Sequence, residues 1–581
     1  MNDDFSAEQV EQTLLSRRQW LGLLPVPALA AAIGAGLLTE RAAAAEPVQA
    51  SPSRDDLGAR IYSVRAYGAK GDGVTLDTRA VQAAVDACHQ DGGGTVLIPA
   101  GDFLIGTVEL KSNVTLHIAA QGKLLGSADG KQYHAVDAIP LSGDTTLEDG
   151  NWALLFAVNA RNVTVEGAGM IDGQGFQFHS PAPGTPPPSG LGGDRRPYHL
   201  LFYRCERLAV RNIALVDCAY HSVRVIQSRQ VHMDSLYIHN RVNGNNDGFH
   251  FISAEYVTVS NCIVLSQDDA CAMFGSCKYV TISNCVFSTR WSVFRFGGGN
   301  AANISISNCV LYQVFGCPIK FQGNPGSSFE DISFSNLVFR EVTGPIHISV
   351  GPSPRKNPPP GSLERSGAEE SRAPAVARNL SFNNIHGTVT TNPPQLPEAR
   401  VSDHPRAGEG HSCITLNCVG EAKLENISFD NVHLRFGGGG TAEDAARRDL
   451  PQIAGEYFML GPMPAYGFYA RNARGITLQN VRLEHAEPDA RPALILDHVE
   501  DAAIHGLSIQ GDDSAESAVR FIDSGQVLFT GARLLTGSPV FLQVEGAHNE
   551  NIKIDGGDLS KAASPLAFKD GATSKAVQLR D

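Results

Sequence analysis

The chain has 581 residues, enough to bury a large hydrophobic core, and its apolar (42%) and charged (19%) contents are those of a globular protein. Its 59 glycines follow no triplet period, which excludes a collagen and favours a turn-rich β protein. The formal net charge of −14 argues against nucleic acid as a partner.

Residues 1–45 are predicted to be a twin-arginine export signal. The paired Arg17 and Arg18 precede an uncharged apolar run that ends near Leu38, and a small-residue cleavage site follows at 42–45. The run is nearly long enough to span a bilayer, so a membrane anchor is the alternative, but its Ala/Gly-rich character favours removal. We therefore expect an exported, periplasmic or extracellular protein without stable membrane association.

A helix is predicted at Val81–His89, where it would cap the open end of the fold. After it, the chain repeats a short β-rich phrase at nearly equal intervals: VTVSNCIVL around Asn261, VTISNCVFS around Asn284 and ISISNCVLY around Asn308. Each phrase alternates apolar and polar residues and ends at a polar turn. Other copies surround Asn212, Asn336, Asn384, Asn431 and Asn480.

These repeats predict an all-β fold, a right-handed parallel β-helix. A unit of this size cannot bury its apolar face alone, so the copies must stack. Parallel stacking places like residues above one another at about 4.8 Å. Asparagine at the repeated turn tolerates left-handed backbone, and its amide can bond to the next copy.

The eleven cysteines have no zinc-site spacing. Cys262, Cys285 and Cys309 occupy equivalent repeat positions, so we expect them to stack inward as small apolar residues. Two pairs are close enough in sequence to be candidate disulfides: Cys271 with Cys277, and Cys413 with Cys418.

A single catalytic domain is predicted over residues 46–581. The stretch 351–376, rich in proline, serine and charge, interrupts the repeats, which resume at Asn379. A second interruption at 436–466 could fold over one face. Both are expected to be surface excursions.

Polar residues gather between 244 and 320. Asp247 precedes Asp268 by close to one coil, and Asp268 is followed directly by Asp269. The same interval counted onward from Asp269 reaches Arg290, and Lys320 lies on a later coil. A solenoid would place these groups above one another, as carboxylates beside cations.

Such a cluster suits acid/base hydrolysis of a chain that contains uronic acid. Neighbouring carboxylates raise one another's pKa, so one can protonate a leaving oxygen while another activates water. Arginine and lysine would bind a sugar carboxylate. The alternative is that these strings are ordinary solvated turns, which a solenoid offers at every coil.

The sequence resembles the polygalacturonase family, glycoside hydrolase family 28, from about Tyr62 to Lys320. The likeness rests on YSVRAYGAKGDGVTLDTRAVQAAVDAC, GGGTVLIPAGDFLIG, GMIDGQG and RRPYHLLFYRC, and on Asn245-Asn246-Asp247 and Asp268-Asp269, which match the family's Asn-Thr-Asp and Asp-Asp motifs. The resemblance implies hydrolysis of acidic plant (pectic) polysaccharide or oligosaccharide, with inversion. It implies that Asp268 is the general acid and that Asp247 and Asp269 hold and deprotonate the water.

Two motifs depart from the family. Thr289-Arg290-Trp291 stands where the family has Gly-His-Gly, and Pro318-Ile319-Lys320 keeps only the lysine of Arg-Ile-Lys. Arg290 or Arg295 could supply the missing cation, and Trp291 could stack on a sugar. Asn245 is a further candidate for substrate binding. The departures make an exo-acting or rhamnogalacturonan-directed hydrolase at least as good an expectation as an endo-polygalacturonase.

The resemblance also points to His221 near the groove, with packing against the next coil as the alternative; His250 and His347 are weaker candidates. A β-helix polysaccharide lyase that uses an arginine or lysine base and calcium is the nearest competing function. A non-catalytic carbohydrate-binding solenoid is another. The hydrolytic mechanism requires no metal or other cofactor, and none is predicted.

Overall fold

The computed structural model describes residues 59–141, 147, 150–178, 195–352, 372–401 and 405–580. The predicted export signal at 1–45 and most of the 351–376 excursion lie outside these residues. Ser53–Asp581 groups into one compact unit, to which the following description applies. Within the described residues, no helix is both long enough and apolar enough to cross a bilayer.

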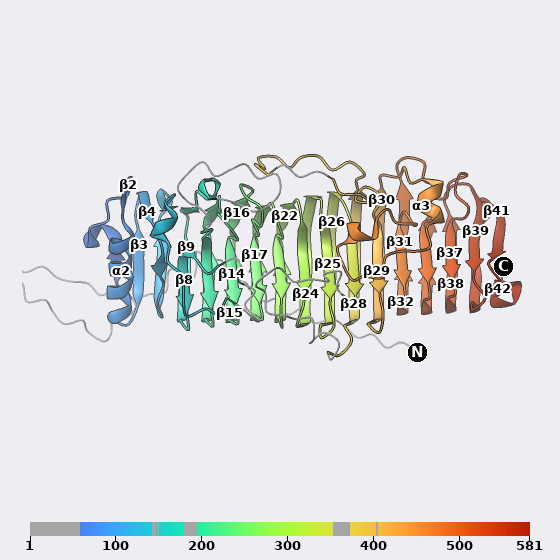
Figure 1. The fold of residues 1–581 in the computed structure, drawn as a ribbon, viewed down its shortest axis with the longest axis horizontal. Coiled ribbons are helices and arrows are strands. Elements are labelled where there is room, and N and C mark those ends of the chain that lie inside the picture. The colour runs from blue at the N-terminus through green and yellow to red at the C-terminus, as the bar shows by residue number, and fades with distance from the viewer. Residues whose placement is uncertain are drawn as a thin grey trace, which may run out of the picture. The chain divides into compact units, whose positions relative to one another are not determined.

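Two sheets, both with parallel strand pairing, make up the fold (Figure 1). The 15-stranded sheet contains β5 (Val108–Glu109), β8 (Ala153–Val158), β11 (Tyr198–Tyr203), β14 (Val223–Ile226), β17 (Phe249–Ile252), β20 (Cys271–Phe274), β23 (Ser292–Gly297), β25 (Cys317–Gly323), β27 (Ile346–Val350), β29 (Ile414–Cys418), β31 (Phe468–Arg471), β34 (Leu494–Asp497), β37 (Val519–Ile522), β39 (Ser538–Glu545) and β41 (Ala562–Lys569).

The 27-stranded sheet contains β1 (Ile61–Ser63), β2 (Asp72–Leu76), β3 (Gly94–Ile98), β4 (Gly101–Ile105), β6 (Val114–Ile118), β7 (Gly122–Gly126), β9 (Arg161–Gly167), β10 (Met170–Asp172), β12 (Glu206–Arg211), β13 (Ala214–Val216), β15 (Arg229–Asp234), β16 (Tyr237–Asn240), β18 (Glu255–Ser260), β19 (Ile263–Ser266), β21 (Lys278–Ser283), β22 (Val286–Thr289), β24 (Asn300–Val314), β26 (Ser328–Val342), β28 (Val376–Val389), β30 (Lys423–Phe436), β32 (Arg474–Gln479), β33 (Arg482–His485), β35 (Glu500–His505), β36 (Ser508–Ile509), β38 (Gly525–Leu534), β40 (Glu550–Asp558) and β42 (Val577–Arg580).

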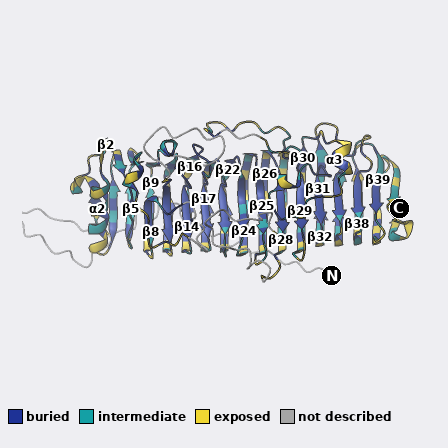
Figure 2. Cartoon of the chain, in the orientation of Figure 1, coloured by how far each residue is buried: buried dark blue, intermediate teal, exposed yellow. Residues whose placement is uncertain are grey.

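Each strand pairs with its equivalent one coil later. Val257 of β18 pairs with Val280 of β21, which pairs with Ile304 of β24, and Ile304 pairs with Ile332 of β26. These four side chains are buried, and Figure 2 shows buried residues along the strands of both sheets. The predicted all-β fold, built of stacked repeats, is therefore confirmed.

The asparagines of the repeat adopt the expected left-handed turn. Asn308, Asn336, Asn384, Asn431 and Asn480 have φ between 49° and 56°. Each amide from Asn336 onward donates to the side-chain oxygen of the preceding asparagine in this series, at 2.7–3.0 Å. The amide ladder predicted from the sequence is thus present on the surface of the stack.

The cysteines behave partly as expected. Cys262, Cys285 and Cys309 are each 1% exposed and lie in the hydrophobic core, as predicted. Both candidate disulfides were wrong, because all eleven cysteines are buried free thiols. The Cys413 sulfur contacts the Thr415 hydroxyl, whereas that of Cys418 contacts the Ala422 carbonyl, so proximity in sequence does not bring the two sulfurs together.

The helix α2 (Thr78–Gln90) extends the predicted Val81–His89 by a few residues at its start and one at its end. Val81, Ala84, Val85 and Cys88 are fully buried in the same core cluster as the strands. Figure 1 shows α2 beside β3 at the N-terminal end of the stack. The helix thus buries apolar residues at that end against the core.

The 436–466 excursion, all of which is described, contains the α-helix α3 (Ala442–Ala446) and the 3₁₀ turn η5 (Tyr457–Leu460). Another segment, between β28 and β29, was not anticipated as an excursion. Both reach the 15-stranded sheet, as the contacts of their side chains show below.

Candidate active site

One row of side chains crosses neighbouring strands of the 15-stranded sheet. The register aligns Arg224 of β14 with His250 of β17, Ala272 of β20, Arg295 of β23 and Lys320 of β25. Neighbouring strands lie about 4.8 Å apart, so successive members of the row can interact directly. The row brings two arginines, a histidine and a buried lysine to one face.

The turns that enter these strands form a second row. The Ser222 amide donates to the Asp247 carbonyl at 3.0 Å, and the Gly248 amide donates to the Asp269 carbonyl at 3.0 Å. These bonds place Asp247 one coil before Asp269. The buried Asn246 fixes the first turn, because its side-chain oxygen accepts from the backbone amides of Val242 and Asn243. The sequence-predicted carboxylates are therefore brought together.

Asp268 and Asp269 have different surroundings. Asp269 is 4% exposed, and its carboxylate accepts from Arg295 Nη1 at 3.4 Å and from the Ser292 amide at 3.3 Å. Asp268 is half-buried and contacts the Asn245 amide at 3.4 Å. Burial and the neighbouring Asp269 charge raise the pKa of Asp268 to about 6. Asp268 can therefore carry a proton in mildly acidic solution.

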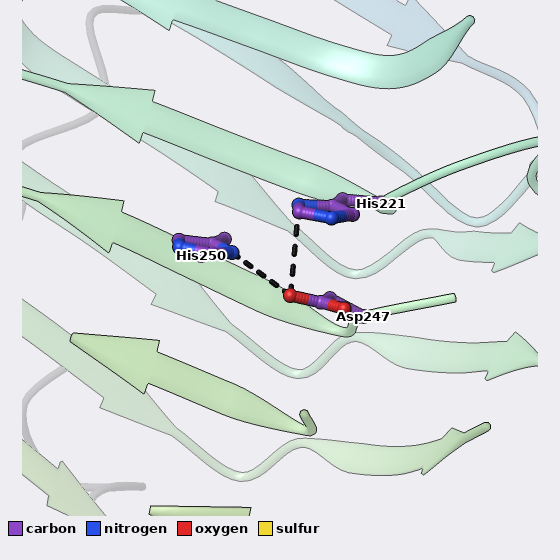
Figure 3. A group of neighbouring side chains, drawn as sticks. All are labelled: His221, Asp247 and His250. Atoms are coloured by element: carbon purple, nitrogen blue, oxygen red, sulfur yellow. Dashed lines mark hydrogen bonds and ion pairs between the residues drawn. The ribbon is translucent and has the colours of Figure 1, made fainter. Parts of the chain in front are cut away.

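Asp247 faces two histidines whose rings stack on each other, with centroids 4.9 Å apart (Figure 3). His250 Nδ1 is 2.8 Å and His221 Nδ1 is 3.6 Å from Asp247 Oδ2. Burial raises the pKa of Asp247 well above its ordinary value, and the charges of Asp268 and Asp269 add to the effect. Burial also lowers the pKa of both histidines well below the ordinary value, which favours the neutral form of each ring.

His221, Asp247 and His250 have ligand atoms close enough to hold a metal ion, a grouping that the sequence analysis had not recognised. The Arg224 guanidinium opposes this use. Its Nη1 lies 3.0 Å from His221 Nδ1 and 3.5 Å from His250 Nδ1. A cation at the imidazole nitrogens would face that charge at close range. The arrangement fits a hydrogen-bonded support for Asp247 better than a metal site.

Arg295 and Lys320 lie beside the aspartates but are paired. Lys320 Nζ lies 2.8 Å from Glu456 Oε2, and the lysine side chain is fully buried. Arg295 Nη1 lies 3.4 Å from Asp269 and 3.7 Å from Glu456. Glu456 comes from the 436–466 excursion, and nothing in the sequence around it indicated this contact.

Arg290 is held away from the predicted role of binding a sugar carboxylate. Its guanidinium forms a bidentate pair with Glu409, at 3.0 and 3.1 Å, and both side chains are buried. Trp291 is half-buried; Arg406 lies 4.0 Å and Lys320 Nζ 5.2 Å from its ring centroid. The chain's own cations thus already contact this ring, and its stacking on a sugar stays a prediction.

His347, one of the weaker candidates, is fully buried, and its Nε2 contacts the Gly455 carbonyl at 2.9 Å. Arg224, which contacts both His221 and His250, was not predicted from the sequence as a site residue. A signal was present, because His221 and Arg224 share the three-residue spacing of Asp247 and His250. In each pair the first residue lies in the turn before the strand, and the second lies in the row of strand residues described above.

The arrangement can perform acid/base chemistry. A half-buried acid with a pKa of about 6 lies next to a carboxylate that an arginine and a backbone amide hold. The acid can donate a proton to a leaving oxygen, and a neighbouring carboxylate can take one from water.

Comparison with known proteins finds relatives among glycosyl hydrolases. The sequence profile of "Glycosyl hydrolases family 28" matches residues 88–396, a little over half of the chain. An exopolygalacturonase of Zea mays is 23% identical over 393 residues, which are 65% of this chain and 84% of that protein.

Two solved structures share the fold. The family 28 exopolygalacturonase of Yersinia enterocolitica superposes with a TM-score of 0.53 at 17% identity, covering 76% of this chain and 78% of that one. The hyperthermoactive exopolygalacturonase of Thermotoga maritima gives 0.52 at 17% identity, covering 73% and 92%.

Proposed function

The chain belongs to glycosyl hydrolases family 28 and is a glycosyl hydrolase; from this premise we propose that it cleaves a galacturonic-acid-containing (pectic) polysaccharide or oligosaccharide. The observation that carries the proposal is the cluster of Asp247, Asp268 and Asp269, in which the pKa of Asp268 is raised to about 6 by burial and by Asp269. The names of the relatives, exopolygalacturonases, support the same substrate class.

In the proposed mechanism Asp268 protonates the leaving glycosidic oxygen. Asp247 and Asp269 orient a water, Asp269 accepts its proton, and attack from the opposite face inverts the anomeric carbon. The Arg295 contact and the Ser292 amide favour the ionised form of Asp269. His250, whose Nδ1 lies 2.8 Å from Oδ2, holds the Asp247 carboxyl group in place.

Exo action, or action on rhamnogalacturonan, is proposed as the finer specificity. Two segments with no counterpart in the repeat bring Glu456, Arg406 and Phe458 against the site residues Lys320 and Trp291. Segments that cover one side of the site favour binding of a chain end over binding of a long internal stretch.

Three features of the protein as a whole complete the proposal. The stacked coils are taken to be a right-handed parallel β-helix, since parallel crossover connections are nearly always right-handed. Residues 46–581 form the single catalytic domain.

Residues 1–45 are proposed to direct export to the periplasm or exterior. Replacing Arg17 and Arg18 by lysine should therefore retain an uncleaved precursor in the cytoplasm. Unchanged export of this variant would contradict a twin-arginine signal.

The test of the reaction follows reducing ends and ultraviolet absorbance together, for residues 46–581 and the Asp268→Asn variant. Substrates are polygalacturonate, rhamnogalacturonan and their oligosaccharides. We expect reducing ends without absorbance, reduced at least about 10²-fold in the variant. Absorbance from an unsaturated sugar would indicate a lyase instead, and no product from any substrate would contradict the proposed function.

A further inference from the structure

Glu456 is fixed beside the aspartates by the segment on both sides of it. The Ala454 amide donates to the Pro352 carbonyl at 2.9 Å, and the Gly455 carbonyl contacts His347 Nε2 at 2.9 Å. On the other side, the Tyr457 hydroxyl shares a 2.9 Å hydrogen bond with that of Thr343. The position of this carboxylate is therefore set by the backbone and its neighbours, not by a freely moving loop.

The carboxylate is ionised and faces the site cations. Burial would raise the pKa of Glu456, but Lys320 and Arg295 lower it to about 2. Its side chain keeps 15% exposure, whereas that of Lys320 has none. A molecule that enters here meets the carboxylate and not the ammonium group.

The two cations beside Glu456 are already balanced by carboxylates of the protein. Lys320 pairs with Glu456, and Arg295 lies between Asp269 and Glu456. An incoming sugar carboxylate would have to displace one of these pairs and would lie close to two negative charges. A neutral sugar meets neither cost, because its hydroxyls can donate to Glu456 and accept from Arg295.

We infer that Glu456 is a specificity-determining residue, which makes the part of the site lined by Arg295 and Lys320 select a neutral sugar over a uronate. The inference rests on the proposed function. It places a neutral residue of the pectic backbone next to the bond that is cut, and it assigns Lys320 to holding Glu456 instead of binding substrate.

The test compares two oligosaccharides of equal length, an unesterified oligogalacturonate and a rhamnogalacturonan fragment of alternating rhamnose and galacturonate. Glu456→Gln keeps the shape and removes the charge. We expect the ratio of kcat/KM for oligogalacturonate to that for the rhamnogalacturonan fragment to rise about tenfold. Glu443→Gln is the matched control, because Glu443 is exposed on the same excursion, and it should leave the ratio unchanged.

Calorimetric binding of the same two ligands to Asp268→Asn, with and without Glu456→Gln, separates this inference from the proposed function. A shift of binding preference toward oligogalacturonate supports the inference even if no protein shows turnover. An unchanged preference, including no binding of either ligand, overturns it. If Glu456→Gln does not fold, the double variant Glu456→Gln/Lys320→Met removes both charges of the buried pair. Arg295 then no longer has Glu456 as a partner, and the binding preference must still shift toward oligogalacturonate.

Discussion

Asp268 and Asp269 are adjacent in the chain, yet the fold gives their side chains different surroundings. The backbone around Asp268 is held by hydroxyl groups, because its carbonyl accepts from Ser266 at 2.8 Å and from Thr289 at 2.6 Å. Its carboxyl remains half-buried, whereas that of Asp269 turns inward to Arg295. The Asp268 side chain is thus the more accessible of the two and that of Asp269 is the more restrained, as the proposed roles of acid and base require.

The pKa of Asp268 predicts an alkaline limit to activity. A raised pKa means that the folded site retains the proton up to about pH 6, so kcat/KM should fall as pH rises through that value. Arg295 lowers this pKa, so Arg295→Gln should move the alkaline limb of the pH profile of kcat/KM to higher pH, whatever it does to the maximal rate. A pH profile of both proteins measures the shift; a limb that stays in place or moves to lower pH would contradict the assignment of the acid.

At the scale of an element, the turn asparagines combine two properties that few residues share. They tolerate positive φ, and their amides bond from coil to coil. Asn384 has φ of 52°, donates to Asn336 and accepts from Asn431. Its neighbours above and below therefore depend on its side chain as well as on its backbone.

Replacing Asn384 separates the two contributions. Both Asn384→Ala and Asn384→Gly lose the amide bonds, but only alanine is strained at positive φ. We expect the alanine variant to be about 1 kcal/mol less stable than the glycine variant. Thermal or denaturant unfolding of the two proteins gives the difference. Equal stabilities, or a more stable alanine variant, would show that the left-handed turn is not strained there.

The Arg290–Glu409 pair fastens the segment between β28 and β29 to the stack. Glu409 is fully buried, accepts from the Arg406 amide at 2.8 Å and contacts the Thr343 hydroxyl. Removing one partner leaves a buried charge without its counterpart, whereas removing both does not.

Glu409→Gln should therefore lower the free energy of unfolding by about 3 kcal/mol. The double variant Arg290→Met/Glu409→Met should recover much of the loss, since it leaves no buried charge behind. Thermal denaturation and limited proteolysis of the segment measure both effects. Additive losses in the double variant would argue against the pair as the fastening contact.

At the scale of the whole described unit, most of the hydrophobic core is one cluster that extends from α2 through the successive coils, and a second, smaller cluster includes Tyr198 and Tyr220. In such a stack each coil is covered by its neighbours, and only the ends need another cover. Val85 of α2 is fully buried against the first coils, whereas Ala83 on the same helix is exposed.

Aspartate at these two positions tests the covering role of α2. Val85→Asp should strongly destabilise the protein and promote aggregation, because it buries a charge and loosens the end of the stack. Ala83→Asp, the same new side chain on the exposed face, should be nearly neutral. Soluble yield and light scattering on heating measure both; similar behaviour of the two variants would mean that the helix is dispensable.

Much of the site was predictable because it follows the repeat. The nearly constant interval between copies sets the strand register, and that register carries Asp247, Asp269 and the Arg224–Lys320 row with it. The asparagine ladder and the inward cysteines follow for the same reason. The catalytic roles themselves came from the resemblance to a family, and they stay predictions.

The sequence by itself therefore determined the stacked β fold, the position of its N-terminal helix and the gathering of three carboxylates, since hydrogen bonding between coils turns a spacing into a contact. Only the tertiary structure decided the partners of the cations. Arg290 pairs with a residue 119 positions away, and Lys320 with one 136 positions away. Those partners lie on segments outside the repeat, whose paths depend on packing and on burial of charge, and no period in the sequence encodes them.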